Sequence, residues 1–319
     1  ENGTCPDSPN SVPLNWSNVG YASMFIMING IVSMSLGLHL EKSLFISSVR
    51  CVVQLTIMGM ILEDVFKARH PLIIMAMVIV LVLLGANEIV FNKNKRRHAR
   101  MFLSVLVSLA ISTITIGIIG SRFALAQDPF WEPQIFIPTM GMLLGNSMSA
   151  IAVGNSYALE QFSGQREKIE MYLAFGASRW EAGRPVAMEA VKMAMLPTIN
   201  SMSIIGLISI PGMMTGQIIG GAPISDAVKY QQIIMFMISS STALSVLISI
   251  FTCVFTCIDN LHRLRIERII TTKPWIYAKK DELVDGVKNI FIGVKNYIFC
   301  CFIRNTSSSD DSEAQVLLN

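Results

Sequence analysis

Seven long apolar runs, separated by short polar or charged stretches, set the pattern of the chain. They cover residues 19–40, 44–62, 71–91, 101–120, 135–159, 191–210 and 233–257. Each run approaches the roughly 20 residues that an α-helix needs to cross the hydrocarbon layer of a bilayer. The pattern therefore predicts an all-α, multi-pass transmembrane protein with about seven spans, in which residues 19–258 form the transmembrane domain.

Glycine and proline residues interrupt the fifth and sixth runs. Gly141, Gly145 and Gly154 fall in the fifth run, and Pro197 falls in the sixth. Glycine weakens a helix through its backbone freedom, and proline does so through its missing N–H group. We therefore expect these two helices to be the ones that break.

The distribution of lysine and arginine predicts the orientation of the chain. With the N-terminus outside, the cytoplasmic loops carry Lys42, Lys93, Lys95, Arg96, Arg97, Arg100, Arg166, Lys168, Arg179 and Arg184. The outer loops then carry Lys67, Arg69, Arg122 and Lys229. Because cytoplasmic loops are enriched in these residues, the sequence predicts an N-out, C-in topology with the segment 166–182 in the cytoplasm.

The two ends of the chain are polar. The extracytosolic segment 1–18 holds the glycosylation sequons of Asn2 and Asn15, although so short a pattern also arises by chance. The cytoplasmic tail 259–319 is basic and amphipathic, with apolar residues at helical spacing in 281–303 that suit a helix on the membrane surface. Cys300 and Cys301 in that tail either carry palmitate or are ordinary reduced thiols.

Composition excludes several classes of protein. Hydrophobic residues make up 52% of the 319 residues, charged residues only 15%, and the mean hydropathy is +0.53. A soluble domain averages about a quarter charged residues. The net charge of +3 gives no reason to expect a nucleic-acid partner, and the six cysteines and four histidines show no metal-ligand spacing. The chain also has no Gly-x-x-x-x-Gly-Lys-Ser/Thr phosphate loop, so we expect it to bind no cofactor.

The cytoplasmic segment 166–182 combines a short helical pattern with a stop signal. Ile169, Leu173 and Phe175 supply apolar side chains, and Gly176 permits a left-handed cap or a close backbone approach. This arrangement predicts a short helix that fits a groove on a partner. The alternative is a solvated amphipathic loop helix.

Three motifs carry a resemblance to a known family. Glu-x-x-Leu-Ala-x-Gly-Ala starts at Glu170, Leu-Pro-x-Ile-Asn-x-Met at Leu196, and Pro-Gly-Met-Met-Thr-Gly-Gln at Pro211. Together they resemble the FetB-type (YbbM) permeases, the membrane halves of ABC transporters, a family that includes plant aluminium-tolerance half-transporters. The likeness covers residues from about 50 to 259. The segment also looks like the coupling motif of ABC importers, but the Ile-x-Leu-Pro that closes that motif is absent around 186–189.

The resemblance implies partners and cargo. It implies a separate ABC ATPase subunit that binds ATP and Mg²⁺, and a homodimer of permeases. Bacterial relatives are linked to iron export, and plant relatives to aluminium tolerance or nucleotide-sugar movement. On this basis we expect the ATPase contact at Glu170, Leu173, Phe175, Gly176 and Arg179.

Polar residues inside the apolar runs are candidates for the transport pathway. Arg50 and Gln54 lie one turn apart in the second run, where a charge costs at least about 2.5–3.5 kcal/mol on insertion scales. A partner should therefore face Arg50, unless its side chain snorkels to the interface. Asn146 and Asn200 either bond helices together or contact cargo.

The segment 211–217 is a candidate gate, because its glycines permit an irregular backbone at membrane depth. Its members are Pro211, Gly212, Met213, Met214, Thr215, Gly216 and Gln217. The thioethers of Met213 and Met214 suit a soft metal ion, although methionine more often serves as packing.

Taken together, these features predict a transport subunit and not an enzyme. We expect a permease in the plasma membrane or an endomembrane that exports a metal ion, such as iron, or a related small solute. The alternatives are a carrier or channel that needs no ATPase, a nucleotide-sugar transporter, and a membrane scaffold that transports nothing.

Overall fold

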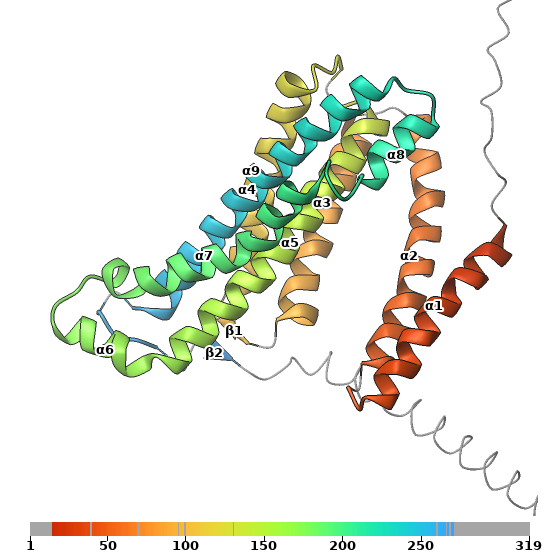
Figure 1. The fold of residues 1–319 in the computed structure, drawn as a ribbon. Coiled ribbons are helices and arrows are strands. Elements are labelled where there is room, and N and C mark those ends of the chain that lie inside the picture. Colours follow the sequence, from red (N-terminus) through yellow and green to blue (C-terminus); the bar gives the residue numbers. More distant parts are fainter. Residues whose placement is uncertain are drawn as a thin grey trace, which may run out of the picture.

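The apolar runs form long helices (Figure 1). The structure, a computed structural model, describes residues 15–38, 40–68, 71–94, 96–98, 100–129, 131–259, 261–265, 267 and 269–270. The long helices are α1 (Trp16–Ser35), α2 (Glu41–Ala68), α3 (Pro71–Glu88), α4 (Met101–Ile119), α5 (Pro133–Gly164), α7 (Arg179–Ile204) and α9 (Ile224–Cys257). The shorter elements are α6 (Arg166–Ala174), α8 (Gly212–Ile219) and the π-helical turns η1 (Ile89–Lys93) and η2 (Gly120–Ala124).

The long helices run up and down between two ends of a bundle (Figure 1). Helix α6 lies at one end, together with the strands β1 (Arg97–His98) and β2 (Ile269–Ile270), which pair antiparallel. Helix α8 lies at the opposite end. We call these the α6 end and the α8 end of the bundle.

Five helices are long and apolar enough to cross a membrane among the residues that the structure describes. They are Glu41–Leu62, Pro71–Lys93, Met101–Ala124, Pro133–Gly164 and Ile224–Cys257. Helices α1 and α7 are not among them, and α7 carries Arg184, Glu189 and Lys192 within its length. The protein is thus a multi-pass helical membrane protein, while the count of seven spans and the orientation stay predictions.

The core lies where α4, α5, α7 and α9 pack together. Phe136, Phe162, Ile151 and Ile250 are among its largest fully buried side chains. Small residues let the helices approach closely, as in other membrane bundles. A Cβ atom on Gly154 of α5 would lie 3.1 Å from Ala194 of α7 and from Ile250 of α9.

A polar seam joins α5 to α9 inside this core. Nδ2 of Asn155 donates to Oγ of Ser249 at 2.9 Å, and the hydroxyls of Ser147 and Ser241 lie 3.3 Å apart. Both pairs are separated by 94 residues in the sequence, so the two helices run parallel, in register. All four side chains are fully buried, and hydrogen bonds of this kind hold helices together where no water is present.

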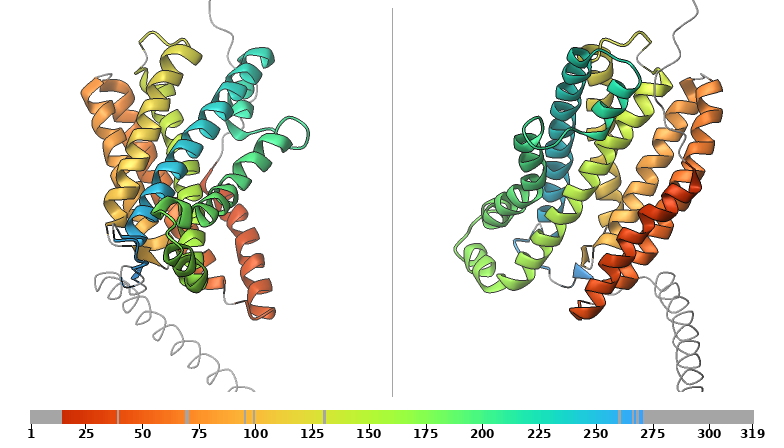
Figure 2. Two further views of the ribbon diagram at one scale, coloured as in Figure 1. Left: turned by 90° about the vertical axis from the view of Figure 1, so that its left-hand side faces the viewer. Right: turned by 45° about the vertical axis from the view of Figure 1, so that its right-hand side comes forward.

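The α1–α2 hairpin stands at one edge of the bundle, as the right-hand view of Figure 2 shows. Its turn is closed by Ser33, whose Oγ accepts the Leu40 N–H at 3.0 Å. No residue of Glu41–Leu62 in α2 is buried against the rest of the protein. Apolar side chains such as Phe45 and Leu55 therefore face outward, as expected of a helix that contacts lipid.

The expectation that the fifth and sixth helices break at their glycines and Pro197 is wrong. Helix α5 continues through Gly141, Gly145 and Gly154, and α7 continues through Pro197. Membrane helices tolerate such residues because neighbouring helices satisfy the freed backbone groups. The sixth helix also starts at Arg179 and not near residue 191, and its end at Ile204 is followed by an irregular stretch up to α8.

Several predicted features lie outside the described residues: Asn2, the surface helix 281–303, Cys300 and Cys301. Asn15 is described, and it lies directly before α1 as its N-cap. Its glycosylation stays a prediction.

Candidate functional site

The corner between α6 and α7 is fixed by hydrogen bonds on both sides. Helix α6 ends in a Schellman motif: Gly176 has a φ of +88°, its N–H donates to Leu173 O at 3.1 Å, and the Ala177 N–H donates to Tyr172 O at 3.0 Å. Ser178, two residues after Gly176, is the N-cap of α7, which starts at Arg179. The predicted short helix and its left-handed cap at Gly176 are confirmed.

A capping box closes the start of α7. Oε2 of Glu181 accepts the Ser178 N–H at 2.8 Å, and the Ser178 hydroxyl accepts the Glu181 N–H at 3.4 Å. Hydrogen bonds from the backbone and side chain of Ser178 lower the pKa of the Glu181 carboxyl below its ordinary value. The carboxylate form therefore stabilises the corner.

The predicted contact residues divide into anchors and exposed groups. Ile169 is buried and Leu173 packs against the core, whereas Phe175 is 84% exposed. The Arg179 guanidinium lies 4.7 Å from the ring centroid of Phe255 on α9. Glu170 accepts from Arg166 at 2.7 Å on the surface of α6. Glu170, Phe175 and Gly176 are thus presented to solvent, while Leu173 and Arg179 hold the corner on the bundle.

A second cluster connects α2 to α3. Nη1 of Arg50 donates to Oε1 of Glu88 at 2.9 Å, and Nη2 donates to Oε2 at 2.7 Å. Nδ2 of Asn92 also donates to Oε2 of Glu88 at 2.6 Å. This bidentate geometry is the strongest form of an arginine–carboxylate contact. It answers the expectation that a partner should face Arg50, whereas Gln54 is exposed on α2, one turn further on.

The π-helical turn η1 starts immediately after Glu88. Its wider turn is confirmed by the Asn94 N–H, which donates to Ile89 O at 3.1 Å, five residues back. Beyond the turn, the buried Asn94 accepts from the Ser156 hydroxyl of α5 at 2.8 Å. Single π-turns inside helices occur frequently at functional sites. Here the turn connects a residue that faces α2 to a residue that faces α5.

The predicted gate lies at the α8 end of the bundle (Figure 1). Residues 212–219 form the regular helix α8, which packs on α9 at the α8 end, and the irregular backbone lies before it, between Ile205 and Pro211. The Thr215 hydroxyl donates to Pro211 O at 3.3 Å. The side chains of Met213, Met214 and Gln217 are half-buried, and Gly212 and Gly216 are exposed.

The structure does not bring the remaining pathway candidates together. Asn146 is exposed on α5, where its Nδ2 donates to Met142 O at 2.9 Å, and Asn200 is exposed on α7. Among the described residues, no three His, Cys, Asp or Glu side chains are grouped so that they could hold a metal ion.

Sequence reasoning missed several residues of these clusters. Glu88 and Asn92 were obscured because they lie near the end of an apolar run, where charged side chains are ordinary. Tyr157 of α5, whose hydroxyl donates to Oε2 of Glu189 on α7 at 2.9 Å, carries no local signal at all. The need of Arg50 for a partner was a clue that a carboxylate lies nearby. The partner, Glu88, is 38 residues away, so the sequence alone does not single it out.

These elements define a class: a multi-pass helical membrane protein with an exposed helical corner at one end. Comparison with known proteins identifies the family. The sequence matches the uncharacterised protein family UPF0014 over residues 16–258, and the chain belongs to that family. The resemblance to FetB-type permeases is thereby confirmed.

The relatives come from bacteria and plants. The UPF0014 membrane protein YjkA of Bacillus subtilis is 31% identical over 74% of this chain and 92% of its own length. The probable iron export permease protein FetB of Escherichia coli is 27% identical over 82% of this chain and 98% of its own length. The protein ALUMINUM SENSITIVE 3 of Arabidopsis thaliana is 29% identical over 70% of this chain and 81% of its own length. No solved structure matches the chain significantly.

Proposed function

We propose that this chain is the membrane-spanning permease subunit of an ABC-type transporter, and that it exports a metal ion or a related small solute. Two such permeases would pair with two separate ATPases, which bind ATP and Mg²⁺. The name of FetB refers to iron export, and the name of ALUMINUM SENSITIVE 3 refers to a metal response. These names motivate the choice of cargo for this chain.

The observation that carries the proposal is the exposed Phe175 on a rigid corner. An aromatic side chain that is 84% exposed on a hydrogen-bonded turn is suited to fill a pocket on another protein. Ile169 is buried below it, so the corner cannot swing freely. A movement of an ATPase subunit that contacts Phe175 would therefore move α6 and α7 together.

Helix α7 is suited to transmit such a movement through the membrane. It extends for 26 residues, or about 39 Å, from the corner towards the α8 end. On the way it packs against α5 and α9 through small residues such as Ala187, Ala190 and Ala194, which are buried. A shift of α6 would then alter the packing near α8, where we place the gate.

We place the cargo pathway beside the Arg50–Glu88 pair. Charges in a membrane are costly and commonly mark transport pathways. Because both terminal nitrogens of Arg50 are held by Glu88, the guanidinium is not open to an anionic cargo in this conformation. The same contact occupies both oxygens of Glu88, so the preference for a metal ion over a nucleotide sugar rests on the names of the relatives.

The experiment that tests the proposal is co-purification from native membranes with Phe175→Asp. We expect an ATPase to co-purify with the unchanged chain and to be lost from the variant. The matched control is Phe123→Asp, because Phe123 is likewise exposed, at 79%, and lies in η2 directly after α4, outside the α6–α7 corner.

The alternatives make different predictions in the same system. An ATPase-independent carrier or channel would transport after reconstitution of the purified chain alone, and no ATPase would be recovered. A scaffold whose tail binds partners would lose its partners on deletion of the residues after 272, whereas a permease would still transport.

A further inference from the structure

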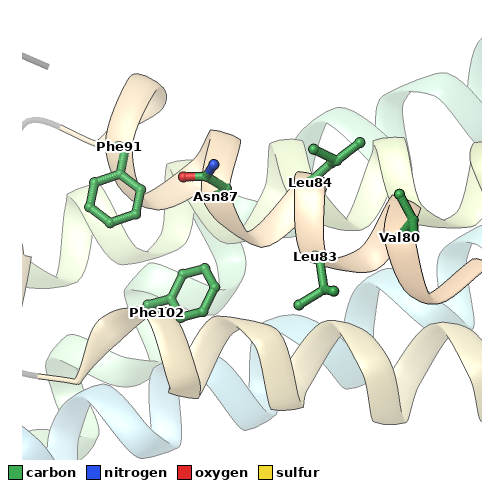
Figure 3. A pocket seen from close by; sticks show the side chains of 6 residues that line it. All are labelled: Val80, Leu83, Leu84, Asn87, Phe91 and Phe102. Carbon is green, nitrogen blue, oxygen red and sulfur yellow. The ribbon is translucent and has the colours of Figure 1, made fainter. Parts of the chain in front are cut away.

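A groove between α3 and α4 opens towards the side of the bundle. Val80, Leu83, Leu84, Asn87, Phe91 and Phe102 line it, and its volume is about 510 Å³ (Figure 3). Five of the six side chains are apolar, and Leu84 is exposed. Phe91 and Phe102 lie side by side at its α6 end, with ring centroids 6.3 Å apart.

The length of the groove matches one leaflet of a bilayer. From Val80 to Phe91 the helix rises by about 16 Å. Half of a hydrocarbon core of about 30 Å is about 15 Å. An extended acyl chain that enters beside Phe91 would thus end near Val80, at the middle of the membrane.

Basic residues stand next to both aromatic residues of the groove in the sequence. Lys93 follows Phe91 by two residues, and Arg100 precedes Phe102 by two residues, and both are exposed. Arg96 lies between them in the same connection and is half-exposed. Arg97 is buried behind this group, with its guanidinium 5.2 Å from the ring centroid of Phe91.

These basic residues belong to the end of η1 and to the connection between η1 and α4. Arg100 has a φ of +67°, and it is the N-cap of α4. β1, formed by Arg97 and His98, pairs with β2, which ties the connection to the later chain. The basic residues therefore lie at the boundary between two candidate membrane spans, Pro71–Lys93 and Met101–Ala124, at the α6 end of the groove.

We propose that this groove binds an anionic phospholipid, with one acyl chain between α3 and α4 and the headgroup on Lys93, Arg96 and Arg100. Any apolar helix surface in a membrane contacts lipid. This groove differs because it is as long as one leaflet and has basic residues at one end, which favour a lipid with a negative headgroup. Basic pockets between membrane helices are known to bind such headgroups. This inference does not depend on the proposed transport function or on an ATPase.

The test is native mass spectrometry of the purified full chain in detergent, titrated with dioleoyl phosphatidylglycerol or dioleoyl phosphatidylcholine. The acyl chains are the same, so only the headgroup differs. A basic side chain near an anionic surface contributes about fivefold in affinity. We expect the triple variant Lys93→Gln, Arg96→Gln, Arg100→Gln to bind phosphatidylglycerol about a hundredfold more weakly, if the three contributions add.

Two matched controls separate the site from general effects. Arg184→Gln removes an exposed charge elsewhere on the bundle and should leave the affinity unchanged. Leu84→Trp should fill the groove and reduce binding of both lipids, whereas Leu103→Trp, at an exposed position of α4 outside the lining, should not.

Three results would overturn the proposal. The first is equal affinity of the unchanged chain for the two lipids. The second is full retention of phosphatidylglycerol by the triple variant or by Leu84→Trp. The third is a change in the ratio of monomer to dimer on Leu84→Trp with no change in lipid binding, which would show that a second copy of the chain covers the groove.

Discussion

Arg50 on α2 holds both carboxylate oxygens of Glu88 on α3, at 2.9 and 2.7 Å, although the two residues are 38 positions apart. No residue of the apolar part of α2 is buried, and this pair is one of the contacts that link the α1–α2 hairpin to the rest of the bundle. A charge that loses its partner inside a membrane costs about 2.5–3.5 kcal/mol on insertion scales. The pair therefore holds α2 to α3, and the loss of either partner should destabilise this contact.

Breaking this pair from one side should destabilise the protein more than removing both charges. We expect Arg50→Gln and Glu88→Gln each to cost about 1–3 kcal/mol of unfolding free energy, because each leaves one charged group without its hydrogen-bond partner. The double variant should recover a large part of that loss. Thermal unfolding in lipid nanodiscs, arranged as a double-mutant cycle, measures the difference. Simple addition of the two single effects would contradict an interaction between these residues.

Replacing Gly176 should damage the corner that we assign to the ATPase. At a φ of +88° a β-carbon is strained, so Gly176→Ala should cost about 1–2 kcal/mol and weaken ATPase co-purification. Gly164→Ala is the control, because Gly164 ends α5 with open space around it and no left-handed backbone. If both variants retain the ATPase equally, the conformation of the corner is not what the partner recognises.

Acid should loosen the start of α7. The pKa of the Glu181 carboxyl is lowered in the folded protein, so its ionised form adds stability above the ordinary value of 4.5. That contribution should disappear as the pH falls from 4.5 through the lowered pKa. Amide hydrogen exchange at residues 178–182, corrected for the intrinsic effect of pH, should report faster opening in this window. Glu181→Gln should remove the pH dependence because it has no ionisable carboxyl, while Glu167→Gln, an exposed change in the first turn of α6, should preserve it.

Helix α5 should tolerate a larger side chain at Gly141, where there is open space, but not at Gly154, where α7 and α9 pack closely. Gly154→Leu meets Ala194 and Ile250 at 3.1 Å from the first added carbon, and overpacking of this kind costs about 1–3 kcal/mol. Gly141→Leu, on the same helix, has no neighbour within 4 Å. Unfolding temperatures should therefore fall for the first variant alone. A comparable fall for Gly141→Leu would reveal a contact with another chain at that position.

Much of the architecture follows from local sequence. The apolar runs are long, so the helices could be predicted, and Gly176 after a short helical pattern was sufficient to place the end of α6. The continuity of α5 and α7 could not be predicted, because glycine and proline are read as helix breakers unless the neighbouring helices are known.

The candidate sites were only partly predictable for a different reason. Arg50 stands out in an apolar run, but its partner depends on how α2 and α3 meet. Ser249 and Asn155 gave no signal, since a buried serine and a lipid-facing serine look the same in sequence. The roles of Leu173 and Arg179 as anchors likewise depend on contacts with the core and with Phe255. Pairings over long sequence separations are the information that local patterns lack.

The separation of Arg50 from Glu88 also has a consequence for biosynthesis. Since synthesis proceeds from the N-terminus, Arg50 enters the membrane 38 residues before its carboxylate partner exists. The nascent α1–α2 hairpin must therefore hold an unpaired guanidinium near the headgroups until α3 has been inserted. Only then can Arg50 reach Glu88, so the hairpin takes its native position against α3 after α3 itself has been inserted.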